Sequence, residues 1–374
     1  MSIYTRGIRA SYKIIKPILF KIEPETVHNR LMSTADYMAR SANIKHLLSS
    51  ILKKPYPILR QKIAAIEFKN PVGLAAGFDY DARLTELLDS VGFGFQTIGT
   101  ITNNPYEGNP RPMLGRLPKS RSLMVNKGFK NKGAAAISRK IAPIHFTIPL
   151  GVSIGSTNSL NLKTQAESIA DICAAFKIFE ASGARHTHYE LNISCPNLKG
   201  TITFYPPKNL DELLSAIDAL KISRPIFIKM PIEKSANEVV QMLDTILKHK
   251  IAGIIIGNLQ KDRANSALQT DELNKFPTGN FSGKPTFAAS NEFISLAYKH
   301  AGDRLVIIGC GGVFSAEDAY EKIKCGASLV QLITGLIFEG PQLVAEINQK
   351  LPTLLQADSF THISQAIGSN HRPT

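Results

Sequence analysis

The sequence predicts an α/β protein, specifically a (β/α)8 TIM barrel with an N-terminal helical extension. Short apolar runs alternate with helix-length amphipathic stretches through the middle and end of the 374-residue chain. A repeated strand and helix indicates a parallel sheet, and eight repeats close such a sheet into a barrel. The eight apolar runs are residues 72–77, 95–100, 149–155, 189–194, 225–230, 253–258, 304–310 and 329–335.

The stretches between these runs carry helix signals. Amphipathic patterns occupy 164–183, 209–221, 236–250 and 315–326. In the last of them Ser315 is the expected N-cap, Asp318 the third helical residue and Gly326 the terminator. We expect the barrel to span 61–352 and a C-terminal tail to follow at 353–374.

Residues 1–60 lie outside the repeat and form an appended helical module, because so few apolar residues could not sustain a core alone. The expected breaks are Pro17, Pro24, Pro55 and Pro57. The first 22 residues mix cations with apolar side chains, which suits an amphipathic helix on a membrane or on the protein's own body. They lack a secretion signal, and no apolar stretch reaches the roughly 20 residues that span a bilayer.

The composition excludes several classes of function. The net charge is +14, but the lysines are spread along the chain without a dense basic run, so we expect a solvated basic surface and no nucleic-acid partner. Attraction to anionic lipid or acidic substrates is the next interpretation. The four cysteines, Cys173, Cys195, Cys310 and Cys325, form no spaced framework and indicate reduced thiols of an intracellular protein. No metal-ligand cluster is present, so no metal is expected.

The segment 189–200 is the most informative about chemistry. Its strand ends in Asn192, Ser194 and Cys195 before Pro196, and strand ends of α/β barrels hold the active site. Cys195, flanked by Asn192 and Asn197, could act as a positioned general base. The alternative is a buried structural thiol, the commonest role of a free cysteine.

A phosphate site is predicted at the last two strands. Strand seven ends in residues 309–312 (Gly-Cys-Gly-Gly) and strand eight in Thr334-Gly335, which allow close backbone approach to an anion. Simple tight turns are the alternative. Lys229, at the end of strand five, would point into the same mouth and could stabilise a reduced flavin, or extend to solvent. The long loop at 260–285 would serve the site or form a lid.

Taken together, these residues resemble the dihydroorotate dehydrogenase family, the flavin-dependent enzymes of pyrimidine synthesis. The first residues, 11–28, look like the N-terminal module of the membrane-associated, quinone-reducing class (class 2). The matching motifs are NPVGLAAGFD (70–79), GFGFQTIGTIT (92–102), GNPRPMLGRLP (108–118), NKGFKNKG (126–133), NISCPN (192–197), FSGKP (281–285), IIGCGG (307–312) and GASLVQLITGLIFEGP (326–341).

The resemblance implies oxidation of dihydroorotate to orotate in UMP biosynthesis, with hydride passed to FMN and then to a quinone. Residues 1–60 would be the membrane and quinone-access module, peripheral on the cytoplasmic face of a membrane. The catalytic base would be Cys195, and the substrate would bind Asn126, Asn192, Asn197 and Asn258. FMN would bind Ala75, Ala76, Gly77, Thr100, Ser153, Asn192, Lys229, Gly283, Gly311, Gly312, Thr334 and Gly335.

Three departures from the family leave alternatives open. Cys195 stands where the quinone class has serine, so electrons could instead pass to fumarate or a nicotinamide carrier. Tyr80 stands where the family has lysine; either Lys127 or Lys130 compensates, or the substrate is another dihydropyrimidine or a cyclic enone. Residues 153–158 (SIGSTN) and Gly257 differ as well. A further alternative is a non-catalytic flavin-binding relic.

Overall fold

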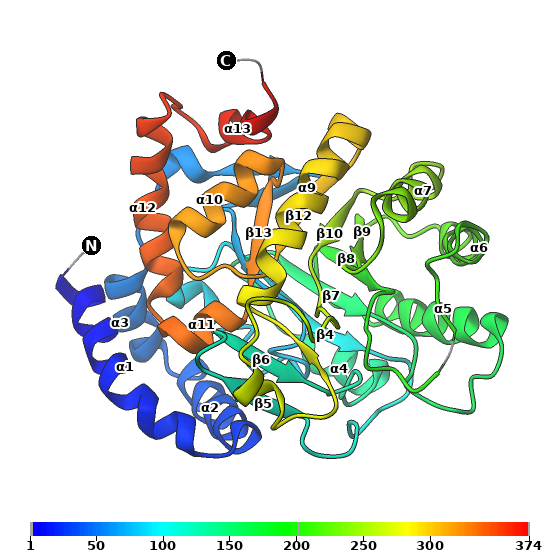
Figure 1. Cartoon of the computed structure of the whole chain (residues 1–374), viewed down its shortest axis with the longest axis horizontal. Coiled ribbons are helices and arrows are strands. Elements are labelled where there is room, and N and C mark those ends of the chain that lie inside the picture. The colour runs from blue at the N-terminus through cyan, green and yellow to red at the C-terminus, as the bar shows by residue number, and fades with distance from the viewer. Residues whose placement is uncertain (1–2, 201, 373–374) are drawn as a thin grey trace.

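The computed structural model describes residues 3–200 and 202–372, and its centre is a closed barrel of eight parallel strands (Figure 1). Each predicted apolar run contributes one strand, which confirms the predicted fold class. Around the barrel the strands are β3 (Val72–Leu74), β4 (Phe95–Ile101), β7 (Leu150–Ile154), β8 (His188–Asn192), β9 (Ile226–Met230), β10 (Gly253–Ile256), β12 (Val306–Cys310) and β13 (Leu329–Leu332).

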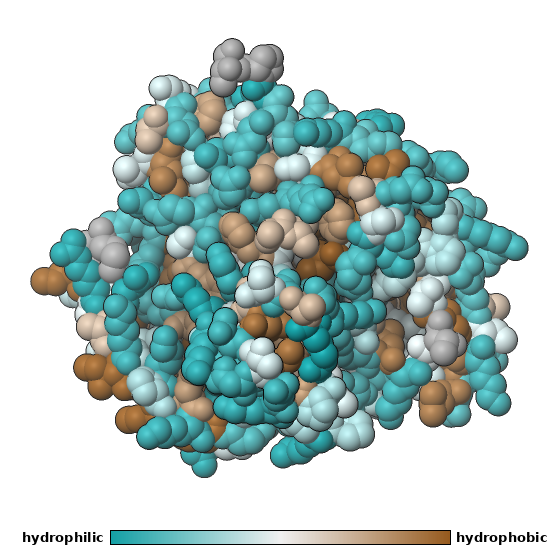
Figure 2. Space-filling model, in the orientation of Figure 1, coloured by the Kyte–Doolittle hydropathy of each residue, from teal (hydrophilic) through white to brown (hydrophobic). Residues whose placement is uncertain are grey.

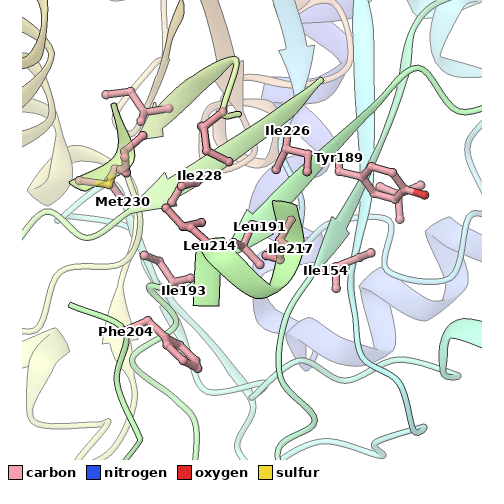
Figure 3. Packing of buried hydrophobic residues seen from close by; sticks show 14 of the residues in the cluster. Ile154, Tyr189, Leu191, Ile193, Phe204, Leu214, Ile217, Ile226, Ile228 and Met230 are labelled. Carbon is pink, nitrogen blue, oxygen red and sulfur yellow. The ribbon is translucent and has the colours of Figure 1, made fainter. Parts of the chain in front are cut away.

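Alternation along each strand divides the side chains between helices and barrel interior. On β8, Tyr189 and Leu191 pack outward, and Figure 3 shows Leu191 beside Leu214 and Ile217 of α6 (Pro207–Asp218). Their neighbours Glu190 and Asn192 therefore point into the barrel, where both are buried. The same alternation turns Lys229 of β9 inward.

Helices cover the outside of the barrel, and the predicted caps form. Ser315 accepts a hydrogen bond from the Asp318 N–H at the start of α10 (Ala316–Cys325), and Gly326 is the C-cap. Full capping boxes begin α5 (Gln165–Ala181) at Thr164 and α7 (Ala236–Ile246) at Ser235. The remaining helices of this layer are α4 (Ala134–Ile141), α9 (Phe287–Ala301), α11 (Thr334–Glu339) and α12 (Leu343–Ala357).

The long loop at 260–285 is tied to a small sheet outside the barrel. Strand β11 (Asn280–Phe281) pairs antiparallel with β6 (Ser122–Val125), which pairs with β5 (Leu114–Leu117). In the short helix α8 (Thr270–Leu273), the buried Glu272 carboxylate accepts hydrogen bonds from the Lys119 and Ser120 N–H groups at 2.9 Å each. The loop is thus anchored at two points rather than unstructured.

Three helices form the N-terminal module: α1 (Ile3–Lys21), α2 (Pro24–Ala39) and α3 (Ala42–Leu52). The expected break at Pro17 is wrong, because α1 continues through it. The helix docks on α11 and α12: the Tyr12 hydroxyl donates to the Ile337 carbonyl at 2.6 Å, and Arg9 pairs with Glu346. Of the described residues, none belongs to a helix long and apolar enough to cross a membrane.

Two further segments are a hairpin at the N-terminal end of the barrel and the C-terminal helices. A hairpin of β1 (Gln61–Ile63) and β2 (Ile66–Phe68) places Phe68 edge-on against Phe95, with ring centroids 5.4 Å apart. Helix α12 continues past residue 352 to Ala357, so the C-terminal segment is continuous with it. Helix α13 (Ile363–Ala366) then packs with two side chains fully buried, Ile363 and Ala366.

Candidate functional site

A cavity with an empty volume of about 1210 Å³ opens where the barrel strands end. The C-terminal ends of the strands supply its polar floor, and β5, β6 and α2 supply its outer wall. Fourteen of the predicted site residues line it: Ala75, Ala76, Gly77, Thr100, Asn192, Cys195, Asn197, Lys229, Asn258, Gly283, Gly311, Gly312, Thr334 and Gly335.

The other two predicted site residues, Asn126 and Ser153, lie behind the cavity wall. The Ser153 hydroxyl is 2.9 Å from the Thr100 hydroxyl, which also accepts a hydrogen bond from the Asn192 side chain at 2.8 Å. Asn126 accepts a hydrogen bond from Asn109 at 3.0 Å. Ser153 therefore supports the lining residue Thr100 directly, and Asn126 is linked to the lining residue Asn197 through Asn109.

The glycine loops after β12 and β13 form one end of the cavity. Gly311 and Gly312 have φ of 110° and 72°, in the region that favours glycine. A Cβ at Gly311 would lie 2.6 Å from the Thr286 hydroxyl oxygen, so a side chain does not fit there. Nearby, the Ser282 and Thr334 hydroxyls are 2.8 Å apart. Backbone without side chains, together with hydroxyl groups, suits a phosphate.

Cys195 lies at the other side of the floor. It keeps some accessible surface because it lines the cavity, yet burial raises the pKa of its thiol to about 11. A hydrogen bond from the Asn197 backbone N–H and the charges of Lys229 and Lys261 act in the opposite direction. The adjacent Ser194 hydroxyl is occupied, because it accepts a hydrogen bond from Asn258 at 2.6 Å. The thiol is thus the candidate base.

The asparagine side chains of the floor are fixed by protein partners. Asn197 donates to the Val125 carbonyl at 3.1 Å and accepts from Asn280 at 2.6 Å. Asn258 accepts from the Leu259 N–H at 2.8 Å and donates to Ser194. Each carboxamide has a second donor hydrogen and a second lone pair available for a ligand. The floor therefore offers donors and acceptors of the kind with which a cyclic imide pairs.

Near α2, a cation stands over an aromatic ring at the edge of the cavity. The Lys127 ammonium is 4.5 Å from the Tyr80 ring centroid, and His28 stacks on Tyr80 with centroids 5.6 Å apart. Burial lowers the pKa of Lys127 to about 8 and raises that of Tyr80 to about 12. Burial, followed by the charge of Lys127, lowers the pKa of His28 to about 3. Of these three groups, only Lys127 carries a charge at pH 7.

The comparisons with known proteins agree with this geometry. A sequence profile described as "Dihydroorotate dehydrogenase" matches residues 58–355. The chain belongs to the dihydroorotate dehydrogenase family. Two similar relatives are both named "Dihydroorotate dehydrogenase (quinone)". One, from Mycobacterium sp., is 33% identical over 361 residues, and the alignment covers 96% of this chain and 99% of the relative. The other, from Gloeobacter violaceus, is 34% identical over 358 residues, covering 96% and 98%.

Solved structures of the family superpose over nearly the whole chain. The crystal structure of DHODH from Eimeria tenella in complex with ferulenol has a TM-score of 0.84 at 26% identity, covering 96% of this chain and 99% of that one. The ligand-free DHODH from the same organism has a TM-score of 0.82 at 27% identity, with 94% and 100% covered. The expected family is therefore confirmed.

Within this dihydroorotate dehydrogenase fold, the residues fit a flavin mononucleotide. The glycine loops offer an anion site at one end, and the lysine and amides of the floor offer polar partners for a heteroaromatic ring. Lys229 is 5% exposed, and its ammonium makes no hydrogen bond or ion pair within the described chain. A buried ammonium that points into a cavity needs a polar partner there.

Sequence reasoning missed two asparagines that hold the floor together. Asn109 donates to Asn126 at 3.0 Å and to the Asn197 carbonyl at 2.9 Å, and accepts from Tyr106 and Asn158. Asn158 in turn accepts from the Lys199 N–H at 2.7 Å. The pair joins three segments far apart in sequence. The position of His28 at the cavity was also not predicted. A histidine followed by an asparagine in an expected helix indicates only a solvent-exposed side chain.

We expect Asn109→Ala to loosen the cavity floor. Four hydrogen bonds are lost in a buried site, so the free energy of unfolding should fall by about 1–3 kcal/mol. Hydrogen exchange measured by mass spectrometry should accelerate at 126–130 and 195–200. Asn209→Ala, which removes one exposed hydrogen bond on α6, is the control. Unchanged exchange in both segments would contradict the role given to Asn109.

Proposed function

We propose that this chain oxidises dihydroorotate to orotate with bound FMN and passes the electrons to a quinone. One observation carries the proposal: a thiol, an unpaired lysine and ring-binding amides share a cavity with a phosphate-type glycine loop. The names of the curated relatives support the same reaction and acceptor.

FMN, when bound, would supply the hydride acceptor for the substrate carbon that neighbours the one deprotonated by Cys195. Cys195, as thiolate, removes the proton from the carbon beside the substrate carbonyl. Asn192, Asn197 and Asn258 orient the ring through its amide and carbonyl groups. Lys229 would stabilise negative charge on the reduced flavin, and the glycine loops would hold its phosphate.

The direct experiment is to add dihydroorotate to the purified protein without oxygen and follow the visible spectrum. Bleaching of a yellow flavin band establishes the cofactor and the substrate half-reaction together. A protein that contains no flavin and binds none on titration with FMN would overturn the proposal.

Replacing Cys195 by alanine should slow this bleaching by about 10²–10⁴-fold, the usual contribution of a general base. The reactive form is the thiolate, and its pKa is raised to about 11, so the wild-type rate should increase with pH toward that value. Stopped-flow absorbance across pH 6–10 measures both effects. Cys173→Ala on α5 is the matched control. A Cys195→Ala protein with the wild-type rate would contradict the assignment.

A carboxylate in the substrate requires a cation, and Lys127 supplies it. Tyr80 cannot carry positive charge, and its ring is covered by the Lys127 ammonium. Lys127 is only 9% exposed and lines the cavity, as does Lys130. Burial makes the Lys127 charge more effective than a solvated one. We therefore assign to Lys127 the compensation that the sequence left open between it and Lys130.

Lys127→Met should raise KM for dihydroorotate by about tenfold to a hundredfold, since a charge-assisted hydrogen bond contributes about 1.5–3 kcal/mol. KM for dihydrouracil, which lacks the carboxylate, should not change. In the wild type, KM for dihydroorotate should rise above pH 8, because Lys127 loses its charge there. Steady-state kinetics test this, with the exposed Lys132→Met as control. A preference of the wild type for dihydrouracil would favour another dihydropyrimidine as the substrate.

We assign the second half-reaction, in which a quinone takes the electrons from the flavin, to the apolar side of the cavity and to the N-terminal module. Leu114, Leu123 and Ile337 line the side of the cavity that faces the N-terminal module, and this apolar wall suits a quinone. Hydrophobic side chains stand out along the lower left edge in Figure 2, where Figure 1 shows α1 and α2. Ile14 and Ile18 of α1 are 73% and 62% exposed. We assign this surface to peripheral contact with the cytoplasmic face of a membrane.

The double variant Ile14→Glu/Ile18→Glu should bind anionic phosphatidylglycerol vesicles at least tenfold more weakly. Each isoleucine buried in lipid contributes about 1.5–3 kcal/mol, and each 1.4 kcal/mol is about tenfold. Wild-type binding should also weaken with salt, because cations flank the helix. Vesicle co-sedimentation measures both. Leu160→Glu, at a side chain 69% exposed on a barrel loop, is the control. Equal binding by all three proteins would exclude docking through α1.

A further inference from the structure

A polar layer lies inside the barrel, directly below the cavity floor. The lowest interior layer is apolar and includes Phe95, Phe227 and Leu329. Two residues further along their strands, β4 and β13 present Thr97 and Gln331 to the interior, and β8 presents Glu190. Bulky aliphatic side chains normally fill such layers. A buried carboxyl group in this position therefore needs a reason.

Glu190 is completely buried and only half satisfied. Its Oε1 accepts hydrogen bonds from the Thr97 hydroxyl at 2.6 Å and the Gln331 amide at 2.5 Å. Its Oε2 has no partner. Oε1 thus receives two hydrogen bonds from donors, which suits a carboxylate, and the carboxylate can direct the lone pairs of Oε2 at a positive charge.

The nearest element toward the mouth supplies that charge. Lys229 on β9 is level with Asn192 on β8, two residues beyond Glu190, which is about 7 Å along the strand. Glu190 and Lys229 interact electrostatically. Lys229 also acts on the thiols of Cys195 and Cys310, so Glu190 is the one carboxyl group among these three partners. The ammonium therefore stands between the carboxyl group below and the cavity above.

We propose that Glu190 is a positioning residue: as a carboxylate it is the internal counter-charge of Lys229, and it thereby sets the reduction potential of the flavin in the cavity. The inference rests on the proposed function, because it requires a bound flavin. A carboxylate below Lys229 cancels part of the positive potential that the flavin experiences. It thus limits how strongly the protein stabilises the reduced, anionic flavin.

The other titratable groups that face this layer are neutral, so they do not compete for the role. His188 precedes Glu190 on the interior face of β8, and burial lowers its pKa to about 4. Burial raises the pKa of Cys310 on β12, which keeps its thiol protonated. Burial raises the pKa of Glu190 above its ordinary value, and the charge of Lys229 and the hydrogen bonds from Thr97 and Gln331 act against that rise. The two donors on Oε1 and the ammonium above it favour the carboxylate, so the proposal takes Glu190 and Lys229 as the charged pair of the interior.

The test is Glu190→Gln, which keeps an acceptor oxygen for Thr97 and Gln331 but removes the charge. The flavin of this variant should bind sulfite about tenfold more tightly and have a more positive midpoint potential. An effect of this size is expected from one charge at roughly 10 Å in a medium of effective dielectric constant about 20. Glu190→Asp should return both values toward those of the wild type.

The matched control is Glu180→Gln. Glu180 accepts a hydrogen bond from Tyr189 on the outer face of the same strand, so its removal should leave both flavin properties unchanged. If Glu190→Gln does not fold, Glu190→Ala removes the same charge and should shift both values in the same direction. Wild-type sulfite affinity and potential in a flavin-loaded variant would overturn the inference. A wild-type protein without flavin would instead overturn the proposed function.

Discussion

Closure of eight parallel strands into a barrel is the constraint on which the rest of the structure depends. Closure brings the carboxyl ends of all strands to one mouth, and strand alternation then decides which side chains enter it. Tyr189 and Leu191 pack outward on α6 because they are apolar, so Glu190 and Asn192 must face inward. The hydrophobic core outside the barrel thus fixes the orientation of the chemistry inside it.

The cavity is completed by segments that no strand positions directly. Asn280 of the long loop donates to Asn197, and β11 of the same loop pairs with β6, next to Lys127. The Asn109 side chain joins that hairpin region to the loop that carries Cys195. A disturbance in any one of these segments therefore reaches the others through buried hydrogen bonds, which are costly to leave unsatisfied.

Sequence patterns predicted the parts of the fold that depend on local periodicity. All eight strands, the Ser315 cap and the strand-end position of Cys195 follow from apolar runs and capping residues. The pairing of residue 280 with residue 125 could not be predicted, because it joins segments 155 residues apart through backbone hydrogen bonds. The position of Lys127 over Tyr80 depends on the same packing. The path of α1 through Pro17 depends on docking, since contacts to α11 and α12 outweigh one lost backbone hydrogen bond.

A thiol at position 195 would suit the proposed role of base in this cavity better than a hydroxyl group would. Burial disfavours any anion at position 195, and an anionic substrate adds repulsion. A thiol of reference pKa about 8.5 still yields some thiolate under such conditions, whereas a hydroxyl group would need a relay to a second base. The neighbouring Ser194 hydroxyl accepts a hydrogen bond from Asn258 and donates one to Asn192. In the proposed reaction, Lys127 would offset the carboxylate of the substrate and Lys229 the negative charge of the reduced flavin, and Glu190 would limit how far Lys229 does so.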